Sequence, residues 1–452
     1  MASNSNDNND VKLEEQEQLL CSSTFFAGDS IDIDVIDSIC IGSGRFLRSV
    51  LVPALIEANY HPVIIQTRGR SFLDYTISDN NNNNNNSNED EGTADSSYTW
   101  TYEVDTVHYD GKITIDQIPY YGAGTLGSNE GKQDVLNLCA SNLSSMPIEE
   151  NNNINNKPFI IGVGVTEAGL SSSSSKAMID LFDILVALSK NQDLFPSASL
   201  SSSSSNNNEN EKKKQKLENK KQQQTKICII NTDNVSQNGN VICNYMMELA
   251  SDNEDMLSFL NESVVFHNTM VDRITSQRPD DGLVPRAEPI PAKALVIEDL
   301  DQDLPFSFSS SNNKSSLEEK FGVLIRSKPN QLQADIALKL RIANGTHTAI
   351  AHVMALCGMT MTDILSDNDS HDSKLLLNYL DSFFYNQILV GITSNSNNTT
   401  QELCDVTEED AIAVYNDWRK RLIHQHFGLS TFFITQNGAA KGGIRFGPTI
   451  ID

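Results

Sequence analysis

Short apolar runs alternate with amphipathic stretches between residues 31 and 268. Short apolar runs flanked by turn residues predict buried strands, whereas an apolar face that repeats every three to four residues predicts a helix. The predicted strands are residues 31–41, 61–66, 158–165, 227–231 and 263–268, with a strand pair at 100–107 and 112–118. The predicted helices are residues 49–58, 177–188 and 239–250. This order of elements predicts an α/β sheet that is mostly parallel.

Helical periods dominate from residue 330 onward, and buried strand patterns become rare. The predicted helices there are residues 332–357, 374–389 and 408–426. A domain boundary is therefore expected near residues 327–330. We predict an α/β fold with a Rossmann-like dinucleotide-binding domain at 31–328 and a mostly α-helical C-terminal domain at 329–452, which would carry substrate-binding and catalytic residues.

Composition narrows the range of partners. The 452 residues carry a formal net charge of -27, which argues against nucleic acid or an anionic membrane because both require a basic surface. Residues 1–30 are rich in acidic and amide side chains and predict a disordered tail. They show no basic segment followed by an apolar core, as a secretory signal would. The predicted polar surface insertions are residues 80–86, 151–156, 171–175, 200–224, 307–316 and 394–400.

The cysteines and histidines favour a cytoplasmic protein without a metal. The seven cysteines are odd in number and widely spaced, which is typical of reduced thiols. The sequence contains no Cys-x-x-Cys pair and no cluster of histidines at metal-ligand spacing. A small-molecule substrate is the expected partner.

A glycine-containing turn follows the first predicted strand. Gly42-Ser-Gly-Arg-Phe-Leu-Arg lies between that strand and a predicted helix, as in the pyrophosphate-binding turn of a dinucleotide-binding βαβ unit. Leu47 replaces the third glycine of the usual fingerprint, so a plain strand-turn-helix remains an alternative. After the second strand, Thr67, Arg68 and Arg70 stand where an acid would bind the ribose of NAD. The two arginines suit a 2′-phosphate and NADP, or are solvated loop charges.

The segment Lys339-Leu-Arg-Ile-Ala-Asn-Gly-Thr-His carries the strongest candidate chemistry. On an α-helix at about 100° per residue, Lys339, His347 and Asn344 lie at roughly 0°, 80° and 140°, so they share one broad face. A deprotonated amine can accept a proton, and an amide and an imidazole can orient it. The alternative is a solvated lysine beside a core histidine. Polar clusters also follow three predicted strands, where ligands bind in such sheets: Thr166-Glu167, Thr232-Asp-Asn234 and Asn268-Thr-Met-Val-Asp272-Arg273.

Together these stretches resemble the long-chain mannitol dehydrogenases, which include the fructuronate and tagaturonate reductases. The matching stretches occur in the family's order over residues 36–450 and are Gly42-Ser-Gly-Arg-Phe-Leu-Arg, Val165-Thr-Glu-Ala-Gly, Asn231-Thr-Asp-Asn-Val-Ser-Gln-Asn-Gly, Asn268-Thr-Met-Val-Asp-Arg-Ile, Val296-Ile-Glu-Asp and Lys339-Leu-Arg-Ile-Ala-Asn-Gly-Thr-His. The resemblance implies metal-independent, NAD(P)-dependent interconversion of a polyol such as mannitol and its ketose, or reduction of a hexuronate.

The resemblance also implies roles for individual residues. Lys339 would be the general acid/base, Asn234 and Asn344 would hold the substrate oxygen, and His347 would orient the reacting groups. Asp272, Arg421 and Lys441 would contact substrate. The residues implied at the cofactor are Gly42, Gly44, Arg45, Phe46, Thr67, Arg68, Arg70 and Glu167.

Three departures keep other interpretations open. Ile336 stands where the family often has a relay glutamate, Ala168 stands where many members have lysine, and the chain ends at Asp452 where members continue through further helices. A shortened branch and an incomplete sequence both explain the last point. The competing hypotheses are a hexuronate reductase, for which a carboxylate-binding Arg421 or Arg445 would be diagnostic, and a non-catalytic dinucleotide-binding protein.

Overall fold

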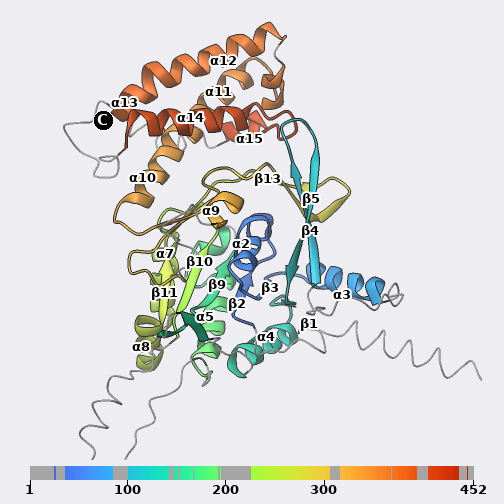
Figure 1. Cartoon of the computed structure of the whole chain (residues 1–452), viewed down its shortest axis with the longest axis vertical. Helices are drawn as coiled ribbons and strands as arrows, with labels where there is room; N and C mark the ends of the chain where they lie inside the picture. Colours follow the sequence, from blue (N-terminus) through green and yellow to red (C-terminus); the bar gives the residue numbers. More distant parts are fainter. Residues whose placement is uncertain are drawn as a thin grey trace, which may run out of the picture.

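A computed structural model describes residues 25–26, 36–84, 100–141, 147–150, 153–165, 167–191, 194, 225–305, 316–367, 369–393, 406–436 and 445. The predicted acidic tail lies outside these residues apart from Phe25–Phe26, as do the predicted insertions at 200–224 and 394–400 and all but the last residue of 307–316. Residues 80–84 and 153–156 were predicted as polar insertions but belong to a helix and a strand, whereas 171–175 form a loop. An α/β body lies below a layer of helices at one end of the molecule (Figure 1).

A seven-stranded sheet forms the centre of the α/β body, in the order β1-β6-β3-β2-β9-β10-β11. Its strands are β1 (Phe25–Phe26), β6 (Gly122–Thr125), β3 (Pro62–Gln66), β2 (Ser38–Ile41), β9 (Phe159–Val163), β10 (Ile227–Asn231) and β11 (Val264–His267). Neighbours from β6 to β11 pair in parallel, whereas β1 is antiparallel. The predicted parallel α/β sheet is confirmed. The first predicted strand begins at Ser38, and residues 31–35 lie outside the described part.

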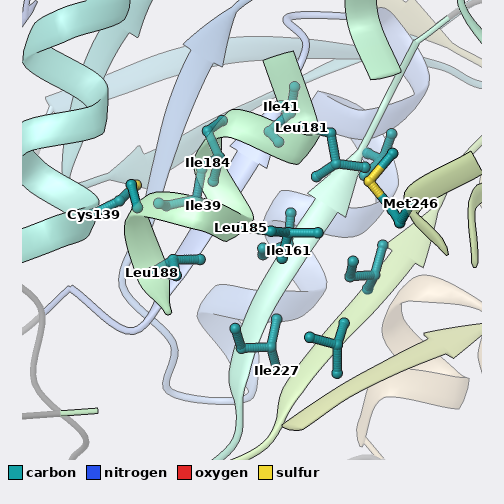
Figure 2. Close-up of a cluster of buried hydrophobic side chains, with 14 of the residues drawn as sticks. Ile39, Ile41, Cys139, Ile161, Leu181, Ile184, Leu185, Leu188, Ile227 and Met246 are labelled. Carbon is teal, nitrogen blue, oxygen red and sulfur yellow. The ribbon is translucent and has the colours of Figure 1, made fainter. Parts of the chain in front are cut away.

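Helices cover both faces of this sheet. They are η2 (Leu47–Leu51) with α2 (Val52–Glu57), α3 (Ser71–Asn84), α4 (Asn129–Ser141), η3 (Glu167–Leu170), α5 (Lys176–Leu188), α7 (Asn238–Leu249), α8 (Glu254–Ser263) and α9 (Ser316–Phe321). Ile39 and Ile41 lie in one core with Leu181 and Ile184 of α5 (Figure 2), and Cys40 lies in the core on the opposite face. Burial on both faces explains the continuous apolar runs.

The first helix begins earlier than the sequence predicts. Its helical backbone starts at Arg45 rather than at residue 49. Arg48 is polar but buried, because its Nε donates to Ser43 O at 2.9 Å and its guanidinium lies over the rings of Phe72 and Tyr102. A buried arginine interrupts the apolar period on which the prediction relied.

The predicted strand pair forms, but in a separate sheet. β4 (Trp100–Val107) and β5 (Ile113–Tyr120) join β13 (Thr275–Arg278) and β14 (Asp281–Ala287) in the order β13-β14-β4-β5. The β4–β5 hairpin reaches the helical layer (Figure 1), where His424 Nε2 lies 3.0 Å from Val107 O. A three-stranded sheet contains β12 (Thr269–Val271), β15 (Leu295–Glu298) and β16 (Val323–Arg326). A two-stranded sheet contains β7 (Pro147–Glu150) and β8 (Asn153–Asn156).

The helical layer contains the predicted C-terminal helices in broken form. Residues 332–357 form α10 (Gln331–Leu338), a π-helical turn η5 (Lys339–Asn344) and α11 (Gly345–Leu356). The remaining elements are η6 (Thr362–Ser366), α12 (His371–Phe383), η7 (Phe384–Ile388), α13 (Leu389–Thr393), α14 (Glu408–Leu422) and α15 (Thr431–Thr435). Residues of α10 to α14 share one apolar core that includes Ile342, Tyr415 and Trp418. Within the ranges given above, no helix is long and apolar enough to cross a membrane.

Candidate active site

Lys339 meets the carboxyl ends of two strands. Its Nζ donates a hydrogen bond to Asn234 Oδ1 at 2.7 Å, in the loop after β10, and another to the carbonyl oxygen of Val271 at the end of β12. Three segments that are distant in the sequence therefore converge on one amine. An α10–η5 segment packed across the strand ends makes this possible, since α10 contacts β12 and β15.

The π-helical turn changes how the Lys339 segment presents its side chains. A π turn is closed by hydrogen bonds between residues five apart and is often found at functional sites. Lys339 and Asn344 are the first and last residues of η5, so they lie much closer in azimuth than the roughly 140° that an α-helix would give. The prediction of one regular α-helix through Lys339 was wrong in this respect.

Burial and charge both act on the amine. Burial lowers the pKa of Lys339, Asp272 opposes that shift, and the positive charges of Arg421 and Arg445 add to it. The net direction is a pKa below that of an ordinary lysine. A lysine in such surroundings can lose its proton more readily near neutral pH.

Arg421 forms a buried ion-pair network beside Lys339. Its guanidinium donates to Asp272 Oδ2 at 3.0 Å and Oδ1 at 3.1 Å, and to Glu288 Oε1 at 2.6 Å. Arg421 and Glu288 expose 2% and 0% of their side chains. Burial raises the pKa of Asp272, but Arg421 and then Lys339 outweigh it, so the net pKa lies below the ordinary range. Asp272 is therefore a fixed anion, and Arg421 is already occupied by two carboxylates.

Asn344 and His347 lie on the next turns of the same segment. The carbonyl oxygen of Asn344 accepts from Thr348 Oγ1 at 2.8 Å and from Arg445 Nη1 at 3.4 Å. The ring of His347 packs against Trp418 with centroids 5.3 Å apart, and the Arg421 guanidinium lies 5.2 Å from the same indole. Trp418 thus joins His347 to the Arg421 network.

A cavity of about 270 Å³, called the glycine cavity below, lies over the carboxyl ends of β2, β3 and β9. Its lining residues are Gly42, Ser43, Gly44, Gln66, Thr67, Arg68, Gly164, Val165, Gly169, Lys176, Ala177 and Asp180. Gly42 has φ +110°, and a Cβ there would lie 2.2 Å from Gly164 O. A Cβ on Gly44 would meet only Gly164 O within 4 Å, at 3.7 Å, so its backbone stays accessible. An accessible glycine backbone at a helix N-terminus fits the pyrophosphate of a dinucleotide.

Residues 165–301 match the family profile described as the mannitol dehydrogenase Rossmann domain. This segment therefore resembles the Rossmann domain of mannitol dehydrogenases. The predicted resemblance to this family is therefore confirmed. A mannitol 2-dehydrogenase from Pyrenophora tritici-repentis (strain Pt-1C-BFP) is 29% identical over 147 residues, which cover 29% of this chain and 24% of that protein. The chain thus spans about a quarter of the length of this curated relative.

Two solved structures are similar over most of the chain but only loosely. The ternary structure of D-mandelate dehydrogenase with NADH and anilino(oxo)acetate is 8% identical with a TM-score of 0.31, over 92% of this chain and 95% of that one. The putative 2-dehydropantoate 2-reductase from Enterococcus faecalis is 9% identical with a TM-score of 0.29, over 90% and 98%. The strand order above carries the fold assignment.

The structure separates the candidate cofactor residues into those that line the glycine cavity, those that lie outside it and one whose side chain is not described. Gly42, Gly44, Thr67 and Arg68 line the glycine cavity. Arg45 is exposed outside that lining, and Phe46 packs against the apolar core. Arg70 Nε donates to Asp74 Oδ1 at 2.7 Å and also lies outside the lining. The side chain of Glu167 lies outside what the structure describes, and so does all of Lys441, which was predicted to contact substrate.

Sequence reasoning missed several residues of both sites. Glu288 and Trp418 complete the surroundings of Arg421, and Lys176 adds a cation to the glycine cavity at the start of α5. Lys176 Nζ donates to Asp180 Oδ2 at 2.6 Å and to Leu126 O at 3.0 Å. Lys176 could have been predicted as a site residue, because it is a lysine at the first position of a helix that follows a strand-end loop. The local sequence gave no indication of Glu288.

Proposed function

We propose that the protein is an NAD(P)-dependent oxidoreductase that interconverts a polyol such as mannitol and its ketose, with Lys339 as general acid/base. The observation that carries this proposal is the Lys339 amine held between Asn234 Oδ1 and Val271 O. A neutral amine has two N–H bonds and one lone pair. With both N–H bonds directed to these acceptors, the lone pair is left for the proton of a substrate hydroxyl.

The neighbouring residues would each have a distinct task. Asn234 fixes the direction of the Lys339 lone pair, and the adjacent Asn344 would donate to the oxygen on which negative charge develops. His347 and Asp272 would orient the substrate and the lysine. A nicotinamide dinucleotide would supply the hydride acceptor, held over Gly42, Gly44 and Gly164 in the glycine cavity.

The charges beside Lys339 favour a neutral substrate over a hexuronate. A uronate carboxylate needs an arginine with free donors, and Arg421 already binds both Asp272 and Glu288. The Arg421 donors that meet Asp272 and Glu288 are therefore not available to a substrate carboxylate. We therefore place a polyol or ketose ahead of fructuronate and tagaturonate.

Arg68 supports the proposal that NADP is accepted. Arg68 lines the glycine cavity, whereas Arg70 is engaged by Asp74. Lys176 lines the same cavity and is paired with Asp180. A cation at the expected ribose position suits a 2′-phosphate, since a phosphate binds Arg through charge-assisted hydrogen bonds.

We further propose the division into a dinucleotide-binding domain at 31–328 and a helical domain at 329–452. The division is supported by the three large apolar cores, because the buried members of the helical core come from residues 337–422 and those of the two sheet cores from 36–323. A small fourth cluster joins Met270 and Val296 to Leu332 across the boundary. A cytoplasmic location, and a small molecule as partner, remain predictions from the sequence.

Initial rates of cofactor oxidation test the function. Purified protein is mixed with NADH or NADPH and with fructose, fructuronate or tagaturonate in parallel. We expect oxidation with fructose or another neutral ketose and little with either uronate. NADPH oxidation at a rate comparable to that of NADH would support the role of Arg68. Turnover confined to a uronate would contradict the substrate assignment, and a folded protein that binds cofactor but oxidises none would favour the non-catalytic alternative.

A further inference from the structure

A cavity of about 440 Å³ adjoins Lys339. It lies between one face of α10, one face of α14 and the loop at 291–293. Asn234 is not part of its lining, so the cavity reaches the lysine from another direction than the substrate-orienting amide. Four aspartates line it, at positions 272, 335, 410 and 417. A cavity with this many polar groups is suited to hold water.

A general base must release each proton it collects before the next turnover. Ile336, three residues before Lys339, packs against an apolar cluster of Met270, Val296 and Leu332 and cannot carry a proton. The proton on Lys339 therefore needs another acceptor. The aspartates of the cavity are the candidates on this side of the lysine.

Three of the four aspartates are already committed. Asp335 binds Lys293 Nζ at 2.5 Å and Arg326 Nε at 2.7 Å. Asp272 is bound by Arg421 through both oxygens. Asp410 accepts from the backbone N–H of Thr407 at 3.0 Å and from its hydroxyl at 2.8 Å, and these bonds lower the pKa of its carboxyl. Asp272 and Asp410 are stabilised as anions and are therefore poor proton acceptors, and both carboxylate oxygens of Asp335 are bound by cations.

Asp417, the fourth aspartate, lies farther from its neighbouring cation than Asp272 and Asp335 do. Its side chain is 46% exposed and lies one helical turn before Arg421, with Oδ2 3.9 Å from Arg421 Nη1. Burial and the negative charge of Asp272 raise the pKa of Asp417, against the opposing effects of Arg421 and Lys420. Tyr109 of the β4–β5 hairpin also interacts with it, since the charge of Asp417 contributes to the raised pKa of Tyr109. Asp417 therefore lines the cavity and is also exposed to solvent.

We propose that Asp417 receives, through water in this cavity, the proton that Lys339 takes from the substrate, and passes it to bulk solvent. An N–H bond of the Lys339 ammonium breaks and an O–H bond forms on Asp417, which then breaks as the proton leaves. No electrons move in this step, and the amine returns to its neutral form. Asp417 acts through Lys339 rather than on the substrate. The inference rests on the proposed dehydrogenase function.

The test compares Asp417→Asn with Asp410→Asn in the full chain, using the polyol and cofactor that the unsubstituted protein turns over. In dilute buffer near neutral pH, Asp417→Asn is expected to lower kcat by on the order of tenfold, less than the loss of a directly acting acid/base group, with KM nearly unchanged. Added imidazole buffer should restore kcat in proportion to its concentration, because it can accept the proton instead. Asp417→Glu should retain most of the rate, and Asp410→Asn removes the same charge from the same cavity without this loss.

Two results would overturn the inference. The first is a kcat of Asp417→Asn that equals the unsubstituted rate in dilute buffer. The second is a loss that buffer does not restore, or that Asp410→Asn reproduces. Absence of turnover in the unsubstituted protein would overturn the proposed function and this inference with it, whereas normal turnover in Asp417→Asn would overturn the inference alone.

Discussion

Replacement of Lys339 by methionine is expected to remove turnover while cofactor binding survives. Methionine keeps the length and the apolar stem of the side chain but provides no proton acceptor. General acid/base groups contribute roughly a hundredfold to ten-thousandfold to the rate, so kcat should fall by at least that lower figure. Binding of NADH or NADPH, measured by fluorescence titration, should change little because Lys339 lies outside the glycine cavity.

Lys328 provides the matched control. It is exposed in the loop between β16 and α10, so Lys328→Met removes a lysine that is not part of the contacts to Asn234 and Val271. Its kcat should match that of the unsubstituted protein. Turnover by Lys339→Met within a few-fold of the control would show that another group takes the hydroxyl proton.

Replacement of Arg421 by methionine should strongly destabilise the folded protein. It leaves Glu288 fully buried and Asp272 largely buried without their shared cation. Loss of one partner from a buried ion pair typically costs about 3–5 kcal/mol of the free energy of unfolding. Urea unfolding followed by circular dichroism measures this difference through the midpoint and slope.

Arg419→Met is the control for that prediction. Arg419 lies on the same helix as Arg421, α14, and its Nε and Nη2 donate to Asp381 of α12 at 2.7 and 3.0 Å. About a third of each of these two side chains is exposed. Exposed pairs are worth about 0–1 kcal/mol, so its loss should be small. Equal losses of unfolding free energy in the two variants would contradict the prediction that burial makes the Arg421 ion pairs more important for stability.

The central strands are the part of the fold that the sequence predicts most closely. Strands β9 and β10 have every residue buried because helices cover both faces, and such strands appear as uninterrupted apolar runs. The β4–β5 hairpin was equally visible, but its sheet was not. β4 pairs with β14 through Asp105 and Arg286. A local sequence pattern does not predict pairing with a strand so far along the chain.

The candidate site was predictable only in part, for two physical reasons. The Lys339 segment and Asn234 stood out because amines and amides are unusual at strand ends and on a helix face that is otherwise apolar. The π turn at Lys339–Asn344 did not, since an assumed period of about 3.6 residues hides a local change of register. The role of Glu288 was also not predictable from the local sequence, because it depends on the ion pair with Arg421, which is 133 residues away.

The pH dependence of the two reaction directions tests the central claim about Lys339 most directly. Polyol oxidation needs the neutral amine and should increase with pH, whereas ketose reduction needs the ammonium and should decrease. Both limbs should share one apparent pKa below the roughly 10.4 of an ordinary lysine, since burial lowers the pKa of Lys339. The measurement is kcat/KM in each direction across neutral and alkaline pH. Profiles without opposite slopes, or a shared pKa at or above the ordinary lysine value, would contradict the account.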